Sequence, residues 1–188
     1  MTTNPRRAAA TLGALALCIG VVTATLAAPA DPARSQLKFG FTQMGVSTDG
    51  EFKKFAADVA FDPAKPEAGK VTVSVDLGAV DAGSSEANEM IRGKDFFDSA
   101  KFPKATFTST AIKAAGAGRF QAEGTLSLKG RTGNVSVPFT ARPEGGGLLI
   151  EGSVPVSRTA YHVGDGDWAD TSTLADAVQI RFKLFVPK

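Results

Sequence analysis

The feature that most constrains the fold of this chain is an alternation of apolar and polar residues that recurs along most of its length. Residues 71–77 (VTVSVDL) show it most clearly, because every second side chain there is apolar. A period of two places alternate side chains on one face of a strand, so each such run predicts a strand with one buried face. Eight runs follow this pattern, at residues 37–41, 55–61, 71–77, 106–112, 120–128, 135–141, 148–156 and 178–186. The alternation therefore predicts an all-β protein.

The connections between the later runs are short and rich in glycine. Gly-rich turns are expected at residues 116–118, 130–133 and 145–147, since glycine supplies the positive φ that tight hairpins need. Connections this short cannot hold crossover helices, so the sheet is expected to be antiparallel over this stretch. Eight antiparallel strands can form either a sandwich or a closed barrel.

Two segments interrupt the strand pattern. Residues 84–97 are expected to form a helix or helical turn, because serines that can cap a helix open the segment and Met90, Ile91 and Phe97 would give it an apolar side. Residues 157–177 read as a long loop rich in Gly, Asp and Thr. Loops of this length are usually functional or mobile.

The amino terminus has a different character from the rest of the chain. Two arginines precede an apolar run, Ala8–Leu26, which ends in small residues. This order is typical of a secretory signal peptide; the alternative is a membrane anchor, although Ala, Gly and Thr dilute the run and no basic cluster follows it. We expect residues 1–30 to be a removed signal peptide, with cleavage after Ala27 or Ala30. Residues 31–188 would then form one periplasmic domain.

Charge and cysteine content exclude several functions for that domain. The chain has 21 Lys+Arg and 19 Asp+Glu, and residues 1–30 hold two of the basic residues and none of the acidic ones, which leaves 19 of each and a formal net charge of zero. The basic excess of a nucleic-acid-binding protein is absent from this count. Cys18, the single cysteine, lies in the expected signal peptide. The mature domain would therefore have no thiol for a disulfide, a metal or a nucleophile.

Motifs for catalysis or metal binding are sparse. His162 is the only histidine, so a His-based zinc site is not expected, and no G-x-S-x-G nucleophile elbow accompanies it. Asp165, Asp167 and Asp170 cluster in the long loop, but their spacing does not match that of a calcium-binding hand loop. We expect these aspartates to cap loop turns, and we expect neither a metal nor a cofactor.

Phenylalanine dominates the aromatic residues. All 13 Phe lie after residue 30, against one Tyr and one Trp. Phe has no polar group and suits a dry lumen, yet the same residues would also fill an ordinary core. This feature alone leaves a ligand pocket and a filled core equally open.

A specific resemblance lies in residues 93–110, GKDFFDSAKFPKATFTST. This segment resembles the lipocalin-like polyisoprenoid-binding family called YceI, whose members carry a similar Asp-Phe-Phe-Asp stretch, then Phe/Tyr-Pro, then a Phe-x-Ser strand. Further segments resemble the family in the same order: 35–39, 44–45, 50–52, 124–130 and 158–176.

The resemblance implies an eight-stranded antiparallel lipocalin-like barrel with a short helical insertion, exported in bacteria. It also implies a long isoprenoid chain in the lumen, with a phosphate or quinone head near the mouth. Many members carry Arg-Asp-x-His in the helical segment, where this chain has Ala87, Asn88 and Met90 while keeping Arg92. This departure favours a neutral head such as a quinone. The late loop resembles a subgroup that often accompanies membrane cytochromes of the b561 type.

We therefore hypothesise a periplasmic carrier of an isoprenoid lipid, either a polyprenyl phosphate or a quinone, and not an enzyme. The lumen candidates are Phe39, Phe41, Phe61, Val73, Val75, Phe97, Phe107, Leu126, Phe139, Ile180 and Phe182. The rim or head-group candidates are Asn88, Arg92, Arg158, Tyr161, His162 and Trp168. Two alternatives stay open: an accessory module that docks on a b561-type cytochrome, and a lipid isomerase or hydrolase that uses His162 with a loop aspartate.

Overall fold

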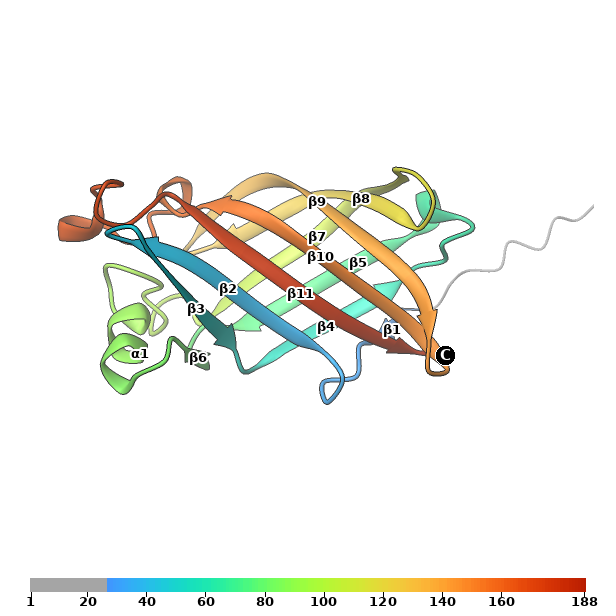
Figure 1. Ribbon diagram of the computed structural model, residues 1–188, viewed down its shortest axis with the longest axis horizontal. Helices are drawn as coiled ribbons and strands as arrows, with labels where there is room; N and C mark the ends of the chain where they lie inside the picture. The colour runs from blue at the N-terminus through green and yellow to red at the C-terminus, as the bar shows by residue number, and fades with distance from the viewer. Residues whose placement is uncertain (1–26) are drawn as a thin grey trace, which may run out of the picture.

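The computed structural model describes residues 27–188, so residues 1–26 of the predicted signal peptide lie outside the described part of the chain. One helix and one large sheet make up the fold (Figure 1). The strands are β1 (Ala28–Pro29), β2 (Gln36–Gln43), β3 (Val46–Phe52), β4 (Phe55–Ala60), β5 (Lys70–Asp76), β6 (Val80–Asp81), β7 (Lys104–Ala114), β8 (Arg119–Leu128), β9 (Arg131–Glu144), β10 (Gly147–Ser157) and β11 (Ala177–Pro187).

All eleven strands belong to a single antiparallel sheet in the order β1-β4-β5-β7-β8-β9-β10-β11-β2-β3-β6. The sheet curls, because the segment after β1 bonds to two strands that are far apart in this order. The Ala30 amide donates to the Ala57 carbonyl of β4, and the Asp31 amide donates to the Phe185 carbonyl of β11, each at 2.8 Å. A continuous curled sheet is a barrel and not a sandwich. The predicted all-β, lipocalin-like barrel is therefore confirmed.

The predicted count of eight strands is wrong, since the described residues form eleven. The eight alternating runs correspond to β2, β4, β5 and β7 to β11, while β1, β3 and β6 were not predicted. In β3 the residues between Val46 and Phe52 are polar or glycine, so no alternation marks it. Its register on β2 places Gly50 opposite Phe39, and a Cβ on Gly50 would lie 2.2 Å from the Phe39 ring. Cross-strand packing thus requires this glycine, which in sequence weakens a strand prediction.

The turn predicted at residues 130–133 is also displaced. The hairpin between β8 and β9 turns at Lys129 and Gly130, whose φ values are 49° and 73°, a left-handed pair suited to a two-residue hairpin. Gly133 lies within β9, where a Cβ would come within 2.6 Å of the Tyr161 hydroxyl oxygen. Gly133 therefore makes room for a ring and does not form a turn.

The helix is shorter than predicted. It is α1 (Ser85–Arg92), and the Ser84 side chain caps it by accepting a hydrogen bond from the Ala87 amide. It ends at Gly93, whose extended backbone turns its amide onto the carbonyls of Glu89 and Met90. Residues 94–97 of the predicted helix lie in turns beyond this cap.

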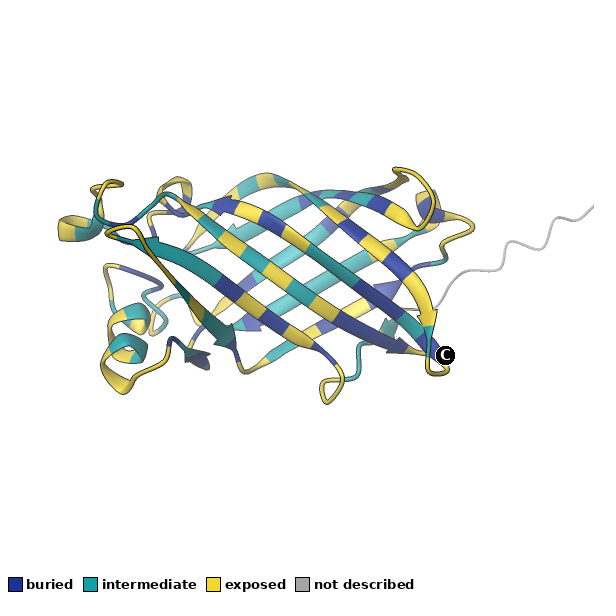
Figure 2. Cartoon of the chain, viewed as in Figure 1, coloured by how far each residue is buried: buried dark blue, intermediate teal, exposed yellow. Residues whose placement is uncertain are grey.

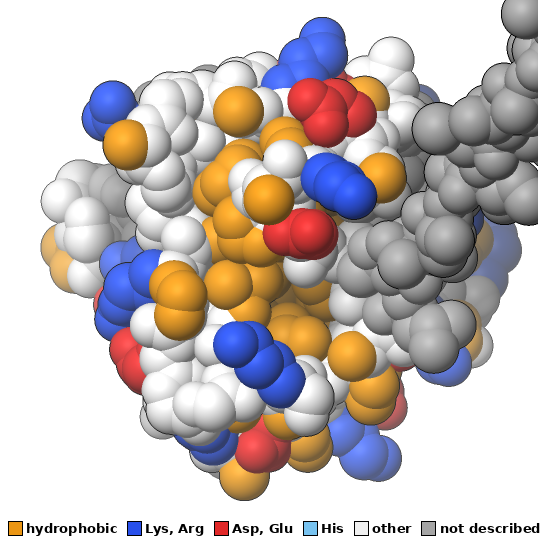
Figure 3. Space-filling model, turned by 90° about the vertical axis from the view of Figure 1, so that its right-hand side faces the viewer, with side chains coloured by type: hydrophobic (Ala, Val, Ile, Leu, Met, Phe, Trp, Pro, Cys, Tyr) orange, Lys and Arg blue, Asp and Glu red, His pale blue; other side chains and the backbone are white. Residues whose placement is uncertain are grey.

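The buried hydrophobic residues of the barrel form two clusters, one at each end. We call the two ends the plug end and the loop end. The plug end is the cluster of buried Ala57, Val59, Phe61, Ile112, Phe120, Ala122, Phe139, Ala141, Ile150, Leu184 and Val186. Figure 3 looks at this end and shows hydrophobic side chains gathered at its centre, with charged side chains around them. The loop end is the opposite one, where α1, the β2–β3 turn and the segment 158–176 lie (Figure 1).

Candidate ligand-binding cavity

An apolar cavity of about 350 Å³ lies inside the barrel. Its wall runs from Val59 and Leu184 near the plug end to Met90, Trp168 and Leu174 at the loop end. Among the described residues, Gln43, Thr106 and Arg158 are the members of this wall whose residue type is polar or charged. A concave, mostly apolar cavity with a few polar groups is the usual form of a small-molecule site.

Burial shows why the interior is hollow toward the loop end. The β-strands alternate between buried and exposed residues near the plug end, whereas many inward-facing residues toward the loop end are only partly buried (Figure 2). Phe41, Val73, Phe107 and Leu126 are apolar, line the cavity and are nevertheless in the intermediate class. Part of each of these side chains therefore faces the open space of the cavity.

Ten of the eleven predicted lumen residues line this cavity: Phe39, Phe41, Val73, Val75, Phe97, Phe107, Leu126, Phe139, Ile180 and Phe182. Phe61 does not. Its ring packs edge-on against Phe120 and Phe139, with centroid distances of 5.0 and 5.4 Å. The lumen prediction for Phe61 is wrong because this aromatic trio fills the plug end. That the other ten bind a ligand stays a prediction.

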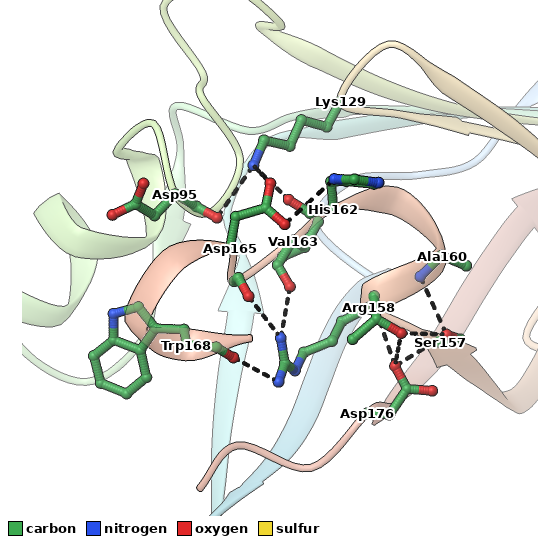
Figure 4. A network of polar contacts seen from close by, with 12 residues as sticks. Asp95, Lys129, Ser157, Arg158, Ala160, His162, Val163, Asp165, Trp168 and Asp176 are labelled. Atoms are coloured by element: carbon green, nitrogen blue, oxygen red, sulfur yellow. Dashed lines mark hydrogen bonds and ion pairs between the residues drawn. The ribbon is translucent and has the colours of Figure 1, made fainter. Parts of the chain in front are cut away.

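Arg158 is the central residue of the loop end (Figure 4). It is 3% exposed, so its guanidinium is buried below the rim where the sequence analysis expected it. Burial lowers the pKa of its guanidinium, and the carboxylates of Asp176 and Asp165 oppose that shift. Its N–H groups donate to the carbonyls of Val163, Gly164, Trp168, Leu174 and Ala175, at N–O distances between 2.6 and 3.3 Å.

These six bonds use all five N–H groups of the guanidinium, since the single Nε–H group is shared between the carbonyls of Leu174 and Ala175. Arg158 therefore satisfies backbone carbonyls of the long loop that would otherwise be buried without a donor. The loop holds two short 3-10 turns, Thr159–Tyr161 and Gly166–Trp168. Arg158 fixes the loop against the barrel and has no N–H group left for a ligand.

A second polar contact ties the loop to the β8–β9 turn. The Lys129 side chain, 9% exposed, lies 3.5 Å from an Asp165 carboxylate oxygen and donates to the carbonyls of Asp95 and His162 (Figure 4). Lys129 thus joins three segments that are far apart in sequence. Its spatial role could not be read from the sequence, where it is one of many lysines.

The remaining rim candidates lie away from the cavity, with one exception. Trp168 lines the cavity, and its ring centroid is 5.6 Å from that of Phe96. His162 has a half-exposed side chain 3.4 Å from Asp165, and Tyr161 is buried over Gly133. The cavity wall includes none of Asn88, Arg92, Tyr161 and His162.

Asn88 and Arg92 act locally at the helix. The Asn88 amide oxygen accepts from the Ala82 amide at 2.6 Å, and exposed Arg92 donates to the Asn88 carbonyl at 3.0 Å. Asn88 thereby ties α1 to the end of β6. The structure does not bring these two residues together with Arg158 or Trp168 around the cavity.

Gln43 is one of the cavity residues that the sequence interpretation missed. It continues the inward-facing series of Leu37, Phe39 and Phe41 on β2. The same alternation could have found it, since residue 43 is the next inward position. A polar residue there ends the apolar run, which is why the predicted strand stopped at residue 41.

Residues 27–188 contain neither a metal-binding cluster nor a membrane-spanning helix. In this part of the chain, no group of three or more His, Cys, Asp or Glu side chains is placed to hold a metal ion. Asp170 instead accepts from the amide and hydroxyl of Ser172, each at 2.8 Å, and these bonds lower its pKa. No helix in the same range has the length and apolar character to cross a membrane.

Comparison with known proteins agrees with this geometry. The YceI-like domain family matches residues 29–186. A UPF0312 protein of Shewanella oneidensis is 39% identical over 114 residues, which is 60% of each chain. A UPF0312 protein of Azotobacter vinelandii is 39% identical over 129 residues, covering 65% of this chain and 67% of the relative. The chain thus aligns with about three-fifths of the length of the Shewanella protein.

Solved structures show the same fold. BcnA of Burkholderia cenocepacia is 41% identical, with a TM-score of 0.81 over 84% of this chain and 99% of BcnA. A polyisoprenoid-binding domain from Saccharophagus degradans has a TM-score of 0.70 at 16% identity, over 86% of this chain and 98% of that domain, a likeness that concerns the fold alone. With the family match over nearly all described residues, this chain belongs to the YceI-like family.

Proposed function

We propose that this protein is a periplasmic carrier that holds a long isoprenoid lipid in its barrel cavity. The observation that supports this most directly is the cavity of about 350 Å³, whose wall is apolar except at Gln43, Thr106 and Arg158. The Saccharophagus degradans neighbour, described as a polyisoprenoid-binding domain, shares the barrel. The predicted signal peptide supports export. The alternative, an accessory module that docks on a membrane b561-type cytochrome, stays a prediction.

Magnitudes favour a ligand that is held by its tail. Each buried methylene contributes about 0.8 kcal/mol, so ten to twenty tail carbons contribute roughly 8–16 kcal/mol. Association costs about 4–15 kcal/mol in lost freedom. A long tail is therefore needed for a net affinity in the micromolar range, which corresponds to about 8 kcal/mol.

The polar groups of the wall favour a neutral head group. A phosphate needs cationic or backbone N–H donors that are free to reach it. Arg158, the charged residue of the wall among those described, has every N–H group bonded to a loop carbonyl. Binding a phosphate to Arg158 would leave several of those carbonyls without donors. A quinone or another neutral head carries no such cost.

The proposal is tested by extracting the protein purified from its native periplasm with organic solvent and analysing the extract by mass spectrometry. We expect a stoichiometric isoprenoid with a neutral head. The Val178→Phe variant, which enlarges a side chain of the cavity wall, should lose most of the bound lipid. The control Gln179→Phe makes a similar change at the next, exposed residue of β11 and should keep it. Protein that carries no lipid and takes up no added isoprenoid would refute the carrier function.

The enzyme alternative has little geometric support. His162 does not line the cavity, and its nearest charged partner is Asp165 in the same loop. We expect the His162→Ala variant to retain the lipid at the wild-type level. Turnover of an added isoprenoid by the wild type that is lost in this variant would favour the enzyme.

A further inference from the structure

The polar residues of the cavity wall differ in what they can offer a ligand. Arg158 has no free N–H group, as described above. Thr106 lies between Ala105 and Phe107 on β7, and both of these line the cavity. Because successive side chains of a strand point to opposite faces, the Thr106 hydroxyl belongs to the outer face. Gln43 is different, since it lies on the same face of β2 as Phe39 and Phe41.

The backbone at Gln43 is held on two sides. Gln43 pairs with Val46 across the β2–β3 hairpin and forms a β-bridge with Leu174 of the long loop. On either side of it, the Met44 amide donates to the Thr173 carbonyl at 2.8 Å, and the Ala175 amide donates to the Thr42 carbonyl at 2.9 Å. The position from which the side chain extends is therefore well fixed.

The side-chain amide itself is available. Within residues 27–188, the hydrogen bonds formed by side chains include none from the Gln43 amide, whereas Thr42 next to it bonds to Ser47. An amide supplies two N–H donors and a carbonyl acceptor without any charge. At the end of an apolar wall, such a group matches a ligand head that is neutral and forms hydrogen bonds.

We propose that Gln43 binds the head group of the lipid and selects a neutral head that carries a carbonyl or a hydroxyl. This inference rests on the proposed function and adds the residue and the head-group chemistry. The tail would fill the apolar wall below Gln43, and the head would lie at the loop end beside it. Headless isoprenoids would gain the tail contacts only and would leave the amide without a partner.

The test compares the isoprenoid hydrocarbon squalene with an isoprenoid benzoquinone. Trp168, the only tryptophan, lines the cavity, so its fluorescence reports occupancy without a label. We expect Gln43→Leu to weaken benzoquinone binding about fivefold to tenfold, the effect of one lost hydrogen bond, and to leave squalene binding unchanged. The matched control Gln36→Leu makes the same change at an exposed residue of β2 and should alter neither.

A second variant identifies the hydrogen-bonding sense. Gln43→Glu replaces the amide by a carboxylate that only accepts, so it should weaken the benzoquinone, whose head only accepts, more than a polyprenol, whose hydroxyl donates. Equal binding of the benzoquinone by the wild type and Gln43→Leu would overturn the role of Gln43 while leaving the carrier function intact. If the wild type binds none of the three probes, the carrier function itself fails.

Discussion

The two ends of the barrel are built from the same alternating strands, but interlocking rings fill the plug end while the loop end surrounds a cavity. At the plug end, Phe61, Phe120 and Phe139 interlock with centroid distances of 5.0 to 5.4 Å, and Ile112 is 0% exposed. At the loop end, α1 has no buried residue although its Met90 and Ile91 line the cavity. Alternation places side chains inward at both ends and does not decide whether they fill the space between them.

This difference in packing suggests that the plug end contributes mainly to stability and the loop end mainly to ligand binding. Close packing gives the plug end its contribution to the free energy of unfolding. The loop end has a buried cluster of its own, which includes Leu77, Phe97 and Leu174, but it lies beside the cavity, and polar contacts through Arg158 and Lys129 hold the long loop against it. Displacing a side chain of the plug end would cost a large part of its packing energy. We therefore expect the lipid to enter the cavity from the loop end.

The largest effect is expected from removing a ring at the plug end. Phe120→Ala should lower the free energy of unfolding by about 3–5 kcal/mol, because it leaves a cavity among close-packed neighbours. Phe41→Ala removes the same ring from the wall of an existing cavity and should cost about 1–2 kcal/mol. Denaturant unfolding of both variants measures the difference. Equal losses would show that the two ends are packed alike.

Arg158→Met should have the next largest effect. Several carbonyls of the long loop would lose their donor, which we expect to cost about 3 kcal/mol. Hydrogen exchange should speed up in residues 159–176 and stay unchanged in β8 and β9 near Phe120. The control Arg181→Met removes an exposed arginine that pairs with Asp49 and should cost less than about 1 kcal/mol. Faster exchange throughout the barrel would mean that Arg158 supports both ends.

A smaller effect is expected from shortening the amino terminus. β1 pairs with β4 through Ala28 and Pro29, and Ala28 and Ala30 pack against the plug-end cluster. A chain that begins at Asp31 should be about 1–2 kcal/mol less stable than one that begins at Ala28, because it loses these contacts. Thermal unfolding of the two chains tests this. Sequencing of the exported protein should then find Ala28, and not Asp31, as its first residue.

The smallest effect concerns acid sensitivity at the loop end. Bonds from the Thr159 hydroxyl, the Thr159 amide and the Ser157 hydroxyl lower the pKa of Asp176 below its ordinary value of 3.8. A carboxylate with a lowered folded pKa stabilises the fold at pH values above 3.8, and this contribution is lost as the pH falls through the folded pKa. Wild-type protein should therefore lose stability below about pH 4 more steeply than Asp176→Asn, by about 1 kcal/mol or less. Parallel unfolding curves for the two proteins between pH 5 and pH 2 would contradict this role.

The fold class and about a third of the cavity wall could be predicted from the sequence alone. Strand alternation is a local property, since a period of two already assigns each residue to a face. For that reason nine of the ten lumen candidates that line the cavity, among them Phe39 and Ile180, follow from strand alternation, and Phe97 alone comes from the segment predicted to be helical. A serine cap at the start of the helix could likewise be predicted from the sequence, because capping depends on residues within one turn.

Which inward residues meet the cavity, and which polar residues reach it, depends on the tertiary structure. Phe61 and Phe107 look alike in sequence, yet one fills the plug end and the other lines the cavity. Arg158 was predicted to lie at the rim, and its burial depends on carbonyls up to 17 residues away in the chain. β3 has no alternating pattern and is a strand because its backbone pairs with the edge of β2. Each outcome depends on contacts between distant segments, and a local sequence pattern carries no information about such contacts.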